Sequence, residues 1–271
     1  MQQPPTQPSE RAGPLPGANP AAPCAEGSSV NANGALAWLM APLSGAATHE
    51  IAPWAYWHAR LMVLAWGVLL PLGALAARYF KVLPRQAWPR QLDSQHWWRA
   101  HRLLQWAGVL LMTVGVALAL GRAAAGGWHA PLGWCLVSLG WAQVLGGYLR
   151  GSKGGPTDQR LRGDHYDMTA RRVWFERLHK ALGWLAILGA VGVIALGLVA
   201  ADAPRWMPLA LGAWWLLLAA LAWRWQRAGR CVDTYQAIWG PDPAHPGNHA
   251  APIGWGVQRR APTAGAKAGA S

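Results

Sequence analysis

Four histidines stand near the start of four successive apolar runs: His58, His101, His129 and His179. An ionisable side chain at membrane depth is costly, so it is rare and usually functional. Imidazole is a common ligand of haem iron, and iron held by two imidazoles has no open position, which suits one-electron transfer. If successive runs are antiparallel helices, the first and third histidines lie near one membrane face and the second and fourth near the other. The pattern predicts two haem sites stacked across a bilayer, His58 with His129 and His101 with His179.

The elements that must position these side chains are five apolar runs, at about 58–80, 103–121, 131–149, 181–200 and 207–225. Each approaches the ~20 residues that a helix needs to cross a ~30 Å hydrocarbon core. Helices are expected because lipid cannot satisfy the backbone groups of an open strand. The predicted fold is an all-α, multi-pass integral membrane protein with a four-helix haem-binding core and one flanking transmembrane helix.

The predicted organisation along the chain has four parts. Residues 1–50 form an outer N-terminal tail, whose first part is expected to be disordered because of its Pro, Gly and Ala content. A short apolar helix or re-entrant piece at 34–47 is expected to cap the outer site. Residues 51–201 form the di-haem core and 202–228 the flanking helix. Residues 229–271 form a Pro- and Gly-rich cytoplasmic tail.

The charge is strongly positive, formally +13 at neutral pH, and it alternates along the chain. The basic side chains gather in the first and third loops between runs and after the fifth run, whereas the second and fourth loops carry little beyond Arg122 and Arg205. This alternation is the positive-inside pattern. It predicts an outside N-terminus and a cytoplasmic C-terminus, and makes lipid rather than nucleic acid the partner of the positive charge.

A short sequence repeat surrounds two of the histidines. His129 and His179 each begin the motif His-x-x-Leu-Gly-Trp, which places Gly133 and Gly183 on the same helix face as the histidine. Glycine there makes room for a flat macrocycle, or it permits close helix packing. The remaining histidines are expected to be solvated in loops and tails: His49, His96, His165, His245 and His249.

Haem propionates need cationic partners near the membrane surface. Arg102 and Lys180, each next to a predicted inner ligand, are candidates, and the further ones are Arg60, Arg150 and Lys153. The alternative is that these side chains serve only membrane orientation. No Cys-x-x-Cys-His occurs, so haem would be bound non-covalently. No nicotinamide or flavin motif occurs either, so the chain is not expected to accept a hydride unaided.

The segment from His58 to Lys81 closely resembles the first core helix of the cytochrome b561 family, above all the branch found with DOMON domains in animals and plants. The matching elements are the histidine, Leu-Met, Trp, Pro-x-Gly and Ala-Arg-Tyr. The three further histidines follow in the family's order, so the resemblance covers about 55–200. Two features depart from the family: only the short 34–47 segment stands where a preceding span is usual, and there is no DOMON domain.

The resemblance implies two b-type haems with the same histidine pairing. It also implies transmembrane electron transfer, commonly from cytosolic ascorbate to an oxidised acceptor or ferric iron outside. Family members bind the donor with basic residues at the cytosolic mouth, and Arg78 and Lys81 occupy that region here. The Ala-, Gly-, Trp- and Arg-rich composition favours a stand-alone bacterial form in the inner membrane, for which a quinol or a soluble reductase is as good a donor as ascorbate.

The predicted function is therefore transfer of single electrons from a cytoplasmic-side donor to a periplasmic-side acceptor, in the manner of a ferric reductase. The sequence leaves open whether the chain is an electron carrier or an oxidoreductase, and whether it forms a homodimer. One alternative is a haem-bearing membrane subunit of a quinone-linked respiratory complex. Another is a non-redox scaffold or haem-handling protein whose histidines bind loosely or not at all.

Overall fold

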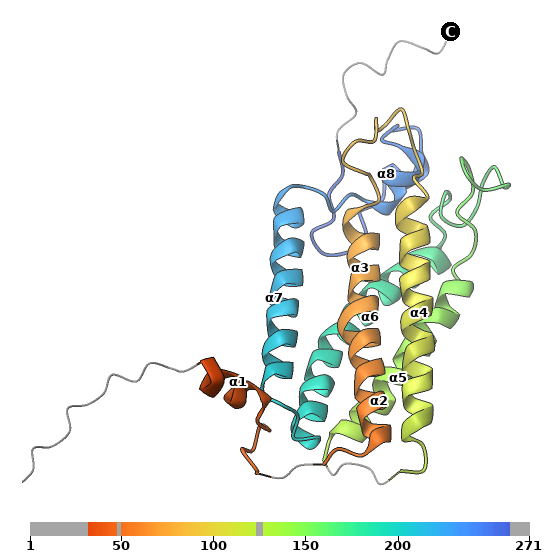
Figure 1. Ribbon diagram of the computed structural model, residues 1–271. Helices are drawn as coiled ribbons and strands as arrows, with labels where there is room; N and C mark the ends of the chain where they lie inside the picture. Colours follow the sequence, from red (N-terminus) through yellow and green to blue (C-terminus); the bar gives the residue numbers. More distant parts are fainter. Residues whose placement is uncertain (1–31, 48–49, 123–126, 261–271) are drawn as a thin grey trace, which may run out of the picture.

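Helices in antiparallel succession build the structure, a computed structural model that describes residues 32–47, 50–122 and 127–260 (Figure 1). Within these residues there is no strand, only two isolated bridges. The first span consists of α2 (Pro53–Met62) and α3 (Leu70–Tyr79). It is followed by α4 (His96–Ala119), α5 (His129–Tyr148), α6 (Ala170–Ala200) and α7 (Trp206–Arg227). We refer to the two ends of the bundle as the α1 end and the α8 end, after the short helices α1 (Ala32–Met40) and α8 (Thr234–Trp239).

The chain is an all-α, multi-pass membrane protein. Among the described residues, four helices are long and apolar enough to span a membrane: Pro53–Tyr79, His96–Ala119, Ala170–Ala200 and Trp206–Arg227. These correspond to four of the five predicted runs. The remaining run forms α5, which has 20 residues and packs against α6 in the bundle (Figure 1). Its glycines, Ser138 and Gln143 dilute its apolar character.

The first span contains a π-helical segment, Val63–Leu69, between α2 and α3. Pro71 follows it and has no N–H to donate to the carbonyl of Gly67, four residues earlier. That carbonyl instead accepts a hydrogen bond of 2.9 Å from the indole nitrogen of Trp214 in α7. The bond satisfies a backbone group that lipid could not satisfy, and it attaches the flanking helix to the core.

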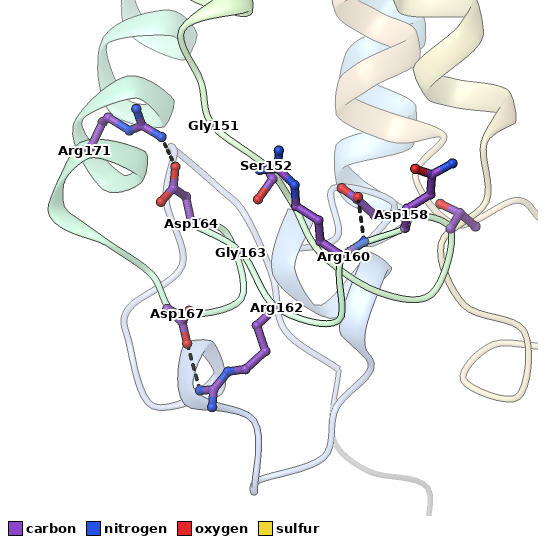
Figure 2. A pocket seen from close by; sticks show the side chains of 11 residues that line it. Gly151, Ser152, Asp158, Arg160, Arg162, Gly163, Asp164, Asp167 and Arg171 are labelled. Atoms are coloured by element: carbon purple, nitrogen blue, oxygen red, sulfur yellow. Dashed lines mark hydrogen bonds and ion pairs between the residues drawn. The ribbon is translucent and has the colours of Figure 1, made fainter.

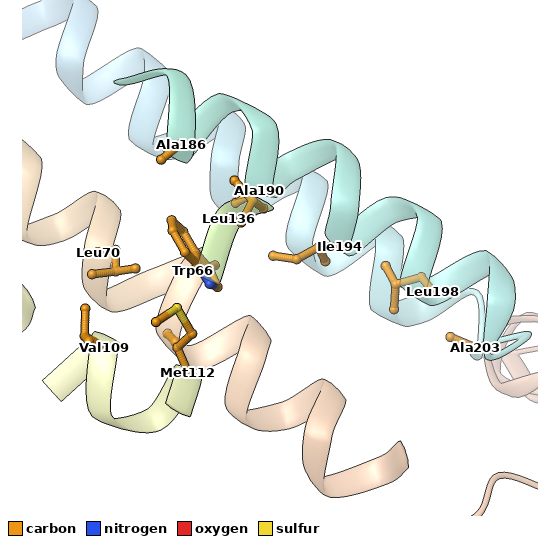
Figure 3. Close-up of a cluster of buried hydrophobic side chains, with 11 residues drawn as sticks. Trp66, Leu70, Val109, Met112, Leu136, Ala186, Ala190, Ile194, Leu198 and Ala203 are labelled. Atoms are coloured by element: carbon orange, nitrogen blue, oxygen red, sulfur yellow. The ribbon is translucent and has the colours of Figure 1, made fainter. Parts of the chain in front are cut away.

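A buried apolar cluster joins the helices and extends along α6 to Ala203, in the turn between α6 and α7 (Figure 3). Trp66 and Leu70 of the first span meet Met112 of α4, Leu136 of α5 and Ala190 of α6 in this cluster. Small residues such as Ala190 let helices approach closely, which is how membrane helices gain packing energy. The four helices α2–α3, α4, α5 and α6 thus form one packed unit.

The short helix α1 lies beside the end of α7 rather than under the first span (Figure 1). Leu43 donates its backbone N–H to the carbonyl of Ala203, and Arg205 donates to the carbonyl of Ala41. Residues 34–47, predicted to form a short helix or a re-entrant piece, contain most of α1, and these bonds attach the residues after α1 to the turn between α6 and α7. Residues 1–31, predicted to be disordered, lie outside the described residues.

The segment predicted to be a cytoplasmic tail is folded between residues 229 and 260. It packs over the α8 end of the bundle, and α8 itself is almost wholly buried (Figure 1). Apolar side chains in this segment, such as Val232, Tyr235 and Ile238, explain why it packs instead of staying extended.

Candidate functional site

The α1-end pair consists of His58 in α2 and His129 at the start of α5. The centres of the two imidazole rings are 6.1 Å apart, and the ring planes are inclined at 81°. His58 Nδ1 lies 2.9 Å from the carbonyl oxygen of Gly115, and His129 Nδ1 lies 3.0 Å from that of Val193. Because a carbonyl can only accept, each Nδ1 carries the proton. Each Nε2 is therefore left with a free lone pair.

The α8-end pair consists of His101 in α4 and His179 in α6. Their ring centres are 6.3 Å apart and their planes are inclined at 80°. His101 Nδ1 donates to the carbonyl of Gly73 at 3.0 Å, whereas the buried Nδ1 of His179 has no partner among the described residues. Aromatic rings stack on both imidazoles, Trp98 on His101 at 6.0 Å and Phe175 on His179 at 5.1 Å between ring centres.

Both pairs have the spacing of two ligands on one metal ion. An imidazole nitrogen lies about 2 Å from the metal it binds and about 1.1 Å from its own ring centre, so two imidazoles on opposite sides of one ion have centres about 6.2 Å apart. The observed separations are 6.1 and 6.3 Å. In the described part of the chain, no three or more His, Cys, Asp or Glu side chains gather into a metal site. The geometry thus fits an iron that brings its own equatorial ligands, as haem iron does.

A large cavity adjoins the α8-end pair, with a volume of about 1170 Å³. His101, His179 and Trp66 are among its lining residues. So are five of the basic side chains singled out in the sequence: Arg78, Lys81, Arg102, Arg150 and Lys180. We call it the α8-end cavity. A flat macrocycle between the two imidazoles would occupy it.

The glycines near the histidines are explained in different ways. A Cβ atom at Gly133 would meet nothing within 4 Å, so helix packing among the described residues does not require glycine there. A Cβ at Gly183 would lie 3.4 Å from Nε2 of Gln143, an ordinary packing distance. The sequence does not single out Gly197, where a Cβ would lie only 2.8 Å from Cε1 of His129. Any side chain at Gly197 would displace that ring.

The predicted donor-binding residues are both bound to the C-terminal segment. Arg78 donates to the carbonyl of Trp255 at 2.7 Å, and Lys81 donates to the carbonyl of Val232 at 3.1 Å. Lys81 is only 5% exposed, and burial followed by repulsion from Lys180 lowers its pKa to about 8. At neutral pH Lys81 is therefore still charged, but it can be neutralised far more easily than a surface lysine.

The two predicted propionate partners differ in their surroundings. Arg102 is exposed, and its guanidinium carbon lies 5.9 Å from the ring centre of Trp98. Lys180 Nζ lies 2.9 Å from a carboxylate oxygen of Glu176 and 2.8 Å from the carbonyl of Ile253. The guanidinium carbon of Arg150 lies 4.2 Å from the ring centre of the same Trp98. Burial, followed by repulsion from Arg172, lowers the pKa of Arg150 to about 10.

A buried charge network beside the α8-end pair escaped the sequence analysis. The carboxylate of Glu176 accepts from Arg172 at 3.0 Å and from Lys180 at 2.9 Å, and Nε2 of His165 lies 3.5 Å away. The signal was present as Arg172, Glu176 and Lys180 at intervals of four, which places them on one helix face. His165 is 1% exposed and packs on Tyr235, so the prediction that it is solvated was wrong.

His165 is expected to make the protein sensitive to acid. Burial, followed by repulsion from Arg172, lowers its pKa to about 3, against 6.5 for a free histidine. Between these values the unfolded chain binds a proton that the folded chain does not, so stability falls as the pH drops below 6.5. We expect this one group to remove roughly 2 kcal/mol of unfolding free energy between pH 8 and pH 5. Thermal unfolding of His165→Phe and wild type over that range measures it; a wild-type profile as flat as the variant's would contradict it.

A second hollow, of about 930 Å³, lies in the loop between α5 and α6 and contains none of the four histidines (Figure 2). Its acidic side chains are engaged within the loop. Asp167 pairs with Arg162 at 2.8 Å, Asp164 pairs with Arg171, and Asp158 accepts the backbone N–H of Arg160. We assign no ligand to it.

Two curated proteins are similar to the chain. One is a cytochrome b561, DM13 and DOMON domain-containing protein of Arabidopsis thaliana, 29% identical over 156 residues, which are 56% of this chain and 15% of that protein. The other is ferric-chelate reductase 1 of Homo sapiens, 28% identical over 121 residues, which are 43% of this chain and 20% of that protein. The matches thus span a fifth or less of each relative. No family model and no solved structure matches the chain.

Proposed function

We propose that this chain is a cytochrome of the b561 family that passes single electrons across a membrane through two b-type haems. The observation that carries the proposal is the pair of imidazole pairs, His58 with His129 and His101 with His179, at opposite ends of one bundle and each spaced for one iron. The similarity to a cytochrome b561-type protein and to a ferric-chelate reductase supports it independently. By this proposal residues 51–201 are the haem-binding core and 202–228 the flanking helix.

The chain's own residues would hold and insulate the haems. A haem with two imidazole ligands supplies one-electron transfer and has no open position for oxygen chemistry. Hydrogen bonds from Nδ1 of His58, His101 and His129 to backbone carbonyls fix the ring orientation and leave Nε2 free, so Nε2 is the atom that would hold the iron. The buried cluster around Trp66 and Met112 excludes water between the two ends.

We further propose that the α8 end faces the cytoplasm and receives the electron. The support is charge: the loops after α3 and α5 together with the helix turns that adjoin them, and the end of α7, carry most of the basic residues and lie at that end (Figure 1). The donor would be a small reductant such as ascorbate or a quinol, or a soluble reductase, with Arg78 and Lys81 near its binding place and Arg102 and Lys180 beside the propionates. The acceptor at the α1 end would be an oxidised group such as chelated ferric iron. A bacterial inner membrane is the location we propose; the sequence leaves a homodimer open.

A haem-bearing subunit of a quinone-linked complex is the second candidate. One observation favours it: the α8-end cavity, at about 1170 Å³, exceeds the ~300–1,000 Å³ of ordinary ligand pockets, which leaves space for a quinol ring beside a haem. Reduction of the purified chain by a quinol, but not by ascorbate, would favour this candidate.

The test is a redox titration followed by absorption, with haem quantified per chain. Two low-spin haems per chain with separate midpoint potentials are expected. Reconstitution in vesicles should then allow a reductant on one side to reduce a ferric chelate on the other. One haem per chain, or none, would contradict the proposal and leave the scaffold or haem-handling alternative.

A further inference from the structure

The segment that follows α7 closes the α8 end of the bundle. Cys231 and Val232 are 0% and 1% exposed, and Nζ of Lys81 donates a hydrogen bond to the carbonyl of Val232. Cys231 also lines the α8-end cavity. The segment is therefore part of the wall of the cavity that holds the predicted ligands His101 and His179.

Residues 253–257, which we call the strap, cross this end and are held by three side chains from three helices. Arg78 of α3 donates to the carbonyl of Trp255 at 2.7 Å, Lys180 of α6 donates to that of Ile253 at 2.8 Å, and Gln226 of α7 donates to that of Gly256 at 2.7 Å. The strap lines the cavity with Ile253, Gly254, Trp255 and Val257. One five-residue stretch thus contacts the cavity and two of the basic side chains at its edge.

Two glycines give the strap its shape. The backbone of Gly254 has φ +117° and that of Gly256 has φ +65°, both in the region that side chains disfavour. A Cβ at Gly256 would lie 2.9 Å from Nε2 of Gln226, the atom that holds the strap. An alanine there would strain the backbone and displace this bond, so Gly256 is the position at which the strap can be loosened with the smallest chemical change.

We propose that the strap positions Arg78 and Lys180 at the edge of the α8-end cavity and controls the access of small reductants to the haem bound there. Its carbonyls occupy N–H groups of both cations, the groups that an anionic donor or a propionate would otherwise bind. The ring centre of Trp255, a side chain that is 84% exposed, lies 5.8 Å from the guanidinium carbon of Arg78. The control of access to a haem rests on the proposed function, whereas the closure of the cavity by the strap does not.

Cys231 offers a native reporter of that closure, independent of haem. In a Cys24→Ser/Cys135→Ser background, Cys231 is the one remaining thiol. A charged, membrane-impermeant thiol reagent applied to the detergent-solubilised protein measures how often the wall opens. Strain from a side chain at positive φ costs about 1–2 kcal/mol, which converts to a roughly 5- to 30-fold rise in labelling rate for Gly256→Ala. Gly121→Ala is the matched control, because Gly121 has φ +70° with nothing within 4 Å and lies at the α1 end.

Stopped-flow reduction by dithionite, a small anionic reductant, supplies the second measurement. We expect the α8-end haem of Gly256→Ala to be reduced about tenfold faster than that of wild type, and Gly121→Ala to behave as wild type. Gln226→Ala removes one strap bond without backbone strain, and it also removes the side-chain oxygen that accepts from Arg78 at 3.0 Å. It should move both rates in the same direction, and it stands in if Gly256→Ala does not fold.

The outcomes separate the two proposals. A chain without haem would overturn the proposed function, whereas the Cys231 labelling would still report on the strap. With haem bound, labelling of Gly256→Ala and Gln226→Ala at the control rate would overturn the closure. Faster labelling with an unchanged dithionite rate would overturn control of access.

Discussion

We expect a His101→Ala protein to retain about half of the wild-type haem, all of it at the α1 end. The reason is geometric: His101 and His179 form one pair, and His58 and His129 form another at the opposite end of the bundle. By the proposed function, removing one imidazole would leave an iron at the α8 end with a single protein ligand, whereas the other pair would keep both. Haem per chain and the redox titration of the purified variant measure the effect, and one of the two midpoint potentials should disappear.

Two further variants sharpen this test. His179→Ala should produce the same loss, and the double variant should lose no more than either single variant, since both act on one haem. His96→Ala is the control, because His96 is the first residue of the same helix α4 and is exposed. Loss of both haems from a His101→Ala protein that remains folded would contradict independent sites, and equal loss from His96→Ala would show that the effect is not one of ligation.

Sequence reasoning could predict the helical fold and bring the histidines together, because the relevant information is local. The length of an apolar run indicates a membrane span. If successive spans are antiparallel, residues at the starts of alternate spans lie at the same end of the bundle. From Pro71 the sequence predicts that the carbonyl of Gly67 lacks its usual helical donor. It does not predict that the indole nitrogen of Trp214 donates to that carbonyl instead. That contact depends on the placement of the flanking helix, which no local pattern determines.

The α8 end could not be predicted in the same way. Its structure depends on contacts between loops far apart in the sequence, such as Lys81 with Val232 and His165 with Tyr235. Pro- and Gly-rich composition indicates an extended tail when it is considered alone. The buried aromatic and apolar residues around α8 outweigh that tendency by packing on the loops after α3 and α5, and this packing buries the basic residues that sequence analysis assigned to an open mouth.

Removal of the Glu176 carboxylate should have the largest effect on stability of any single charge in the described structure. Glu176→Gln keeps the size of the side chain and an oxygen that can accept, but it leaves the guanidinium of Arg172, 5% exposed, without the negative charge that lies 3.0 Å away, and it deprives Lys180 of its carboxylate as well. Breaking a buried pair from one side costs about 3–5 kcal/mol because the remaining charge stays desolvated. Thermal unfolding followed by tryptophan fluorescence should show a Tm lower by roughly 10 °C.

The comparison with an exposed pair isolates burial as the cause. Asp167 pairs with Arg162 at 2.8 Å, but their side chains are 42% and 65% exposed, so Asp167→Asn should cost less than about 1 kcal/mol. Adding Arg172→Met to Glu176→Gln removes the stranded guanidinium and should recover part of the lost stability, because an apolar replacement of a buried pair is often nearly neutral. A double variant no more stable than Glu176→Gln would mean that the loss arises from packing or from Lys180 rather than from the charge left on Arg172. Recovery in the double variant would instead show that the balance of buried charge is the source of the lost stability. That balance would then be what holds α6, beside His179, against the folded C-terminal segment.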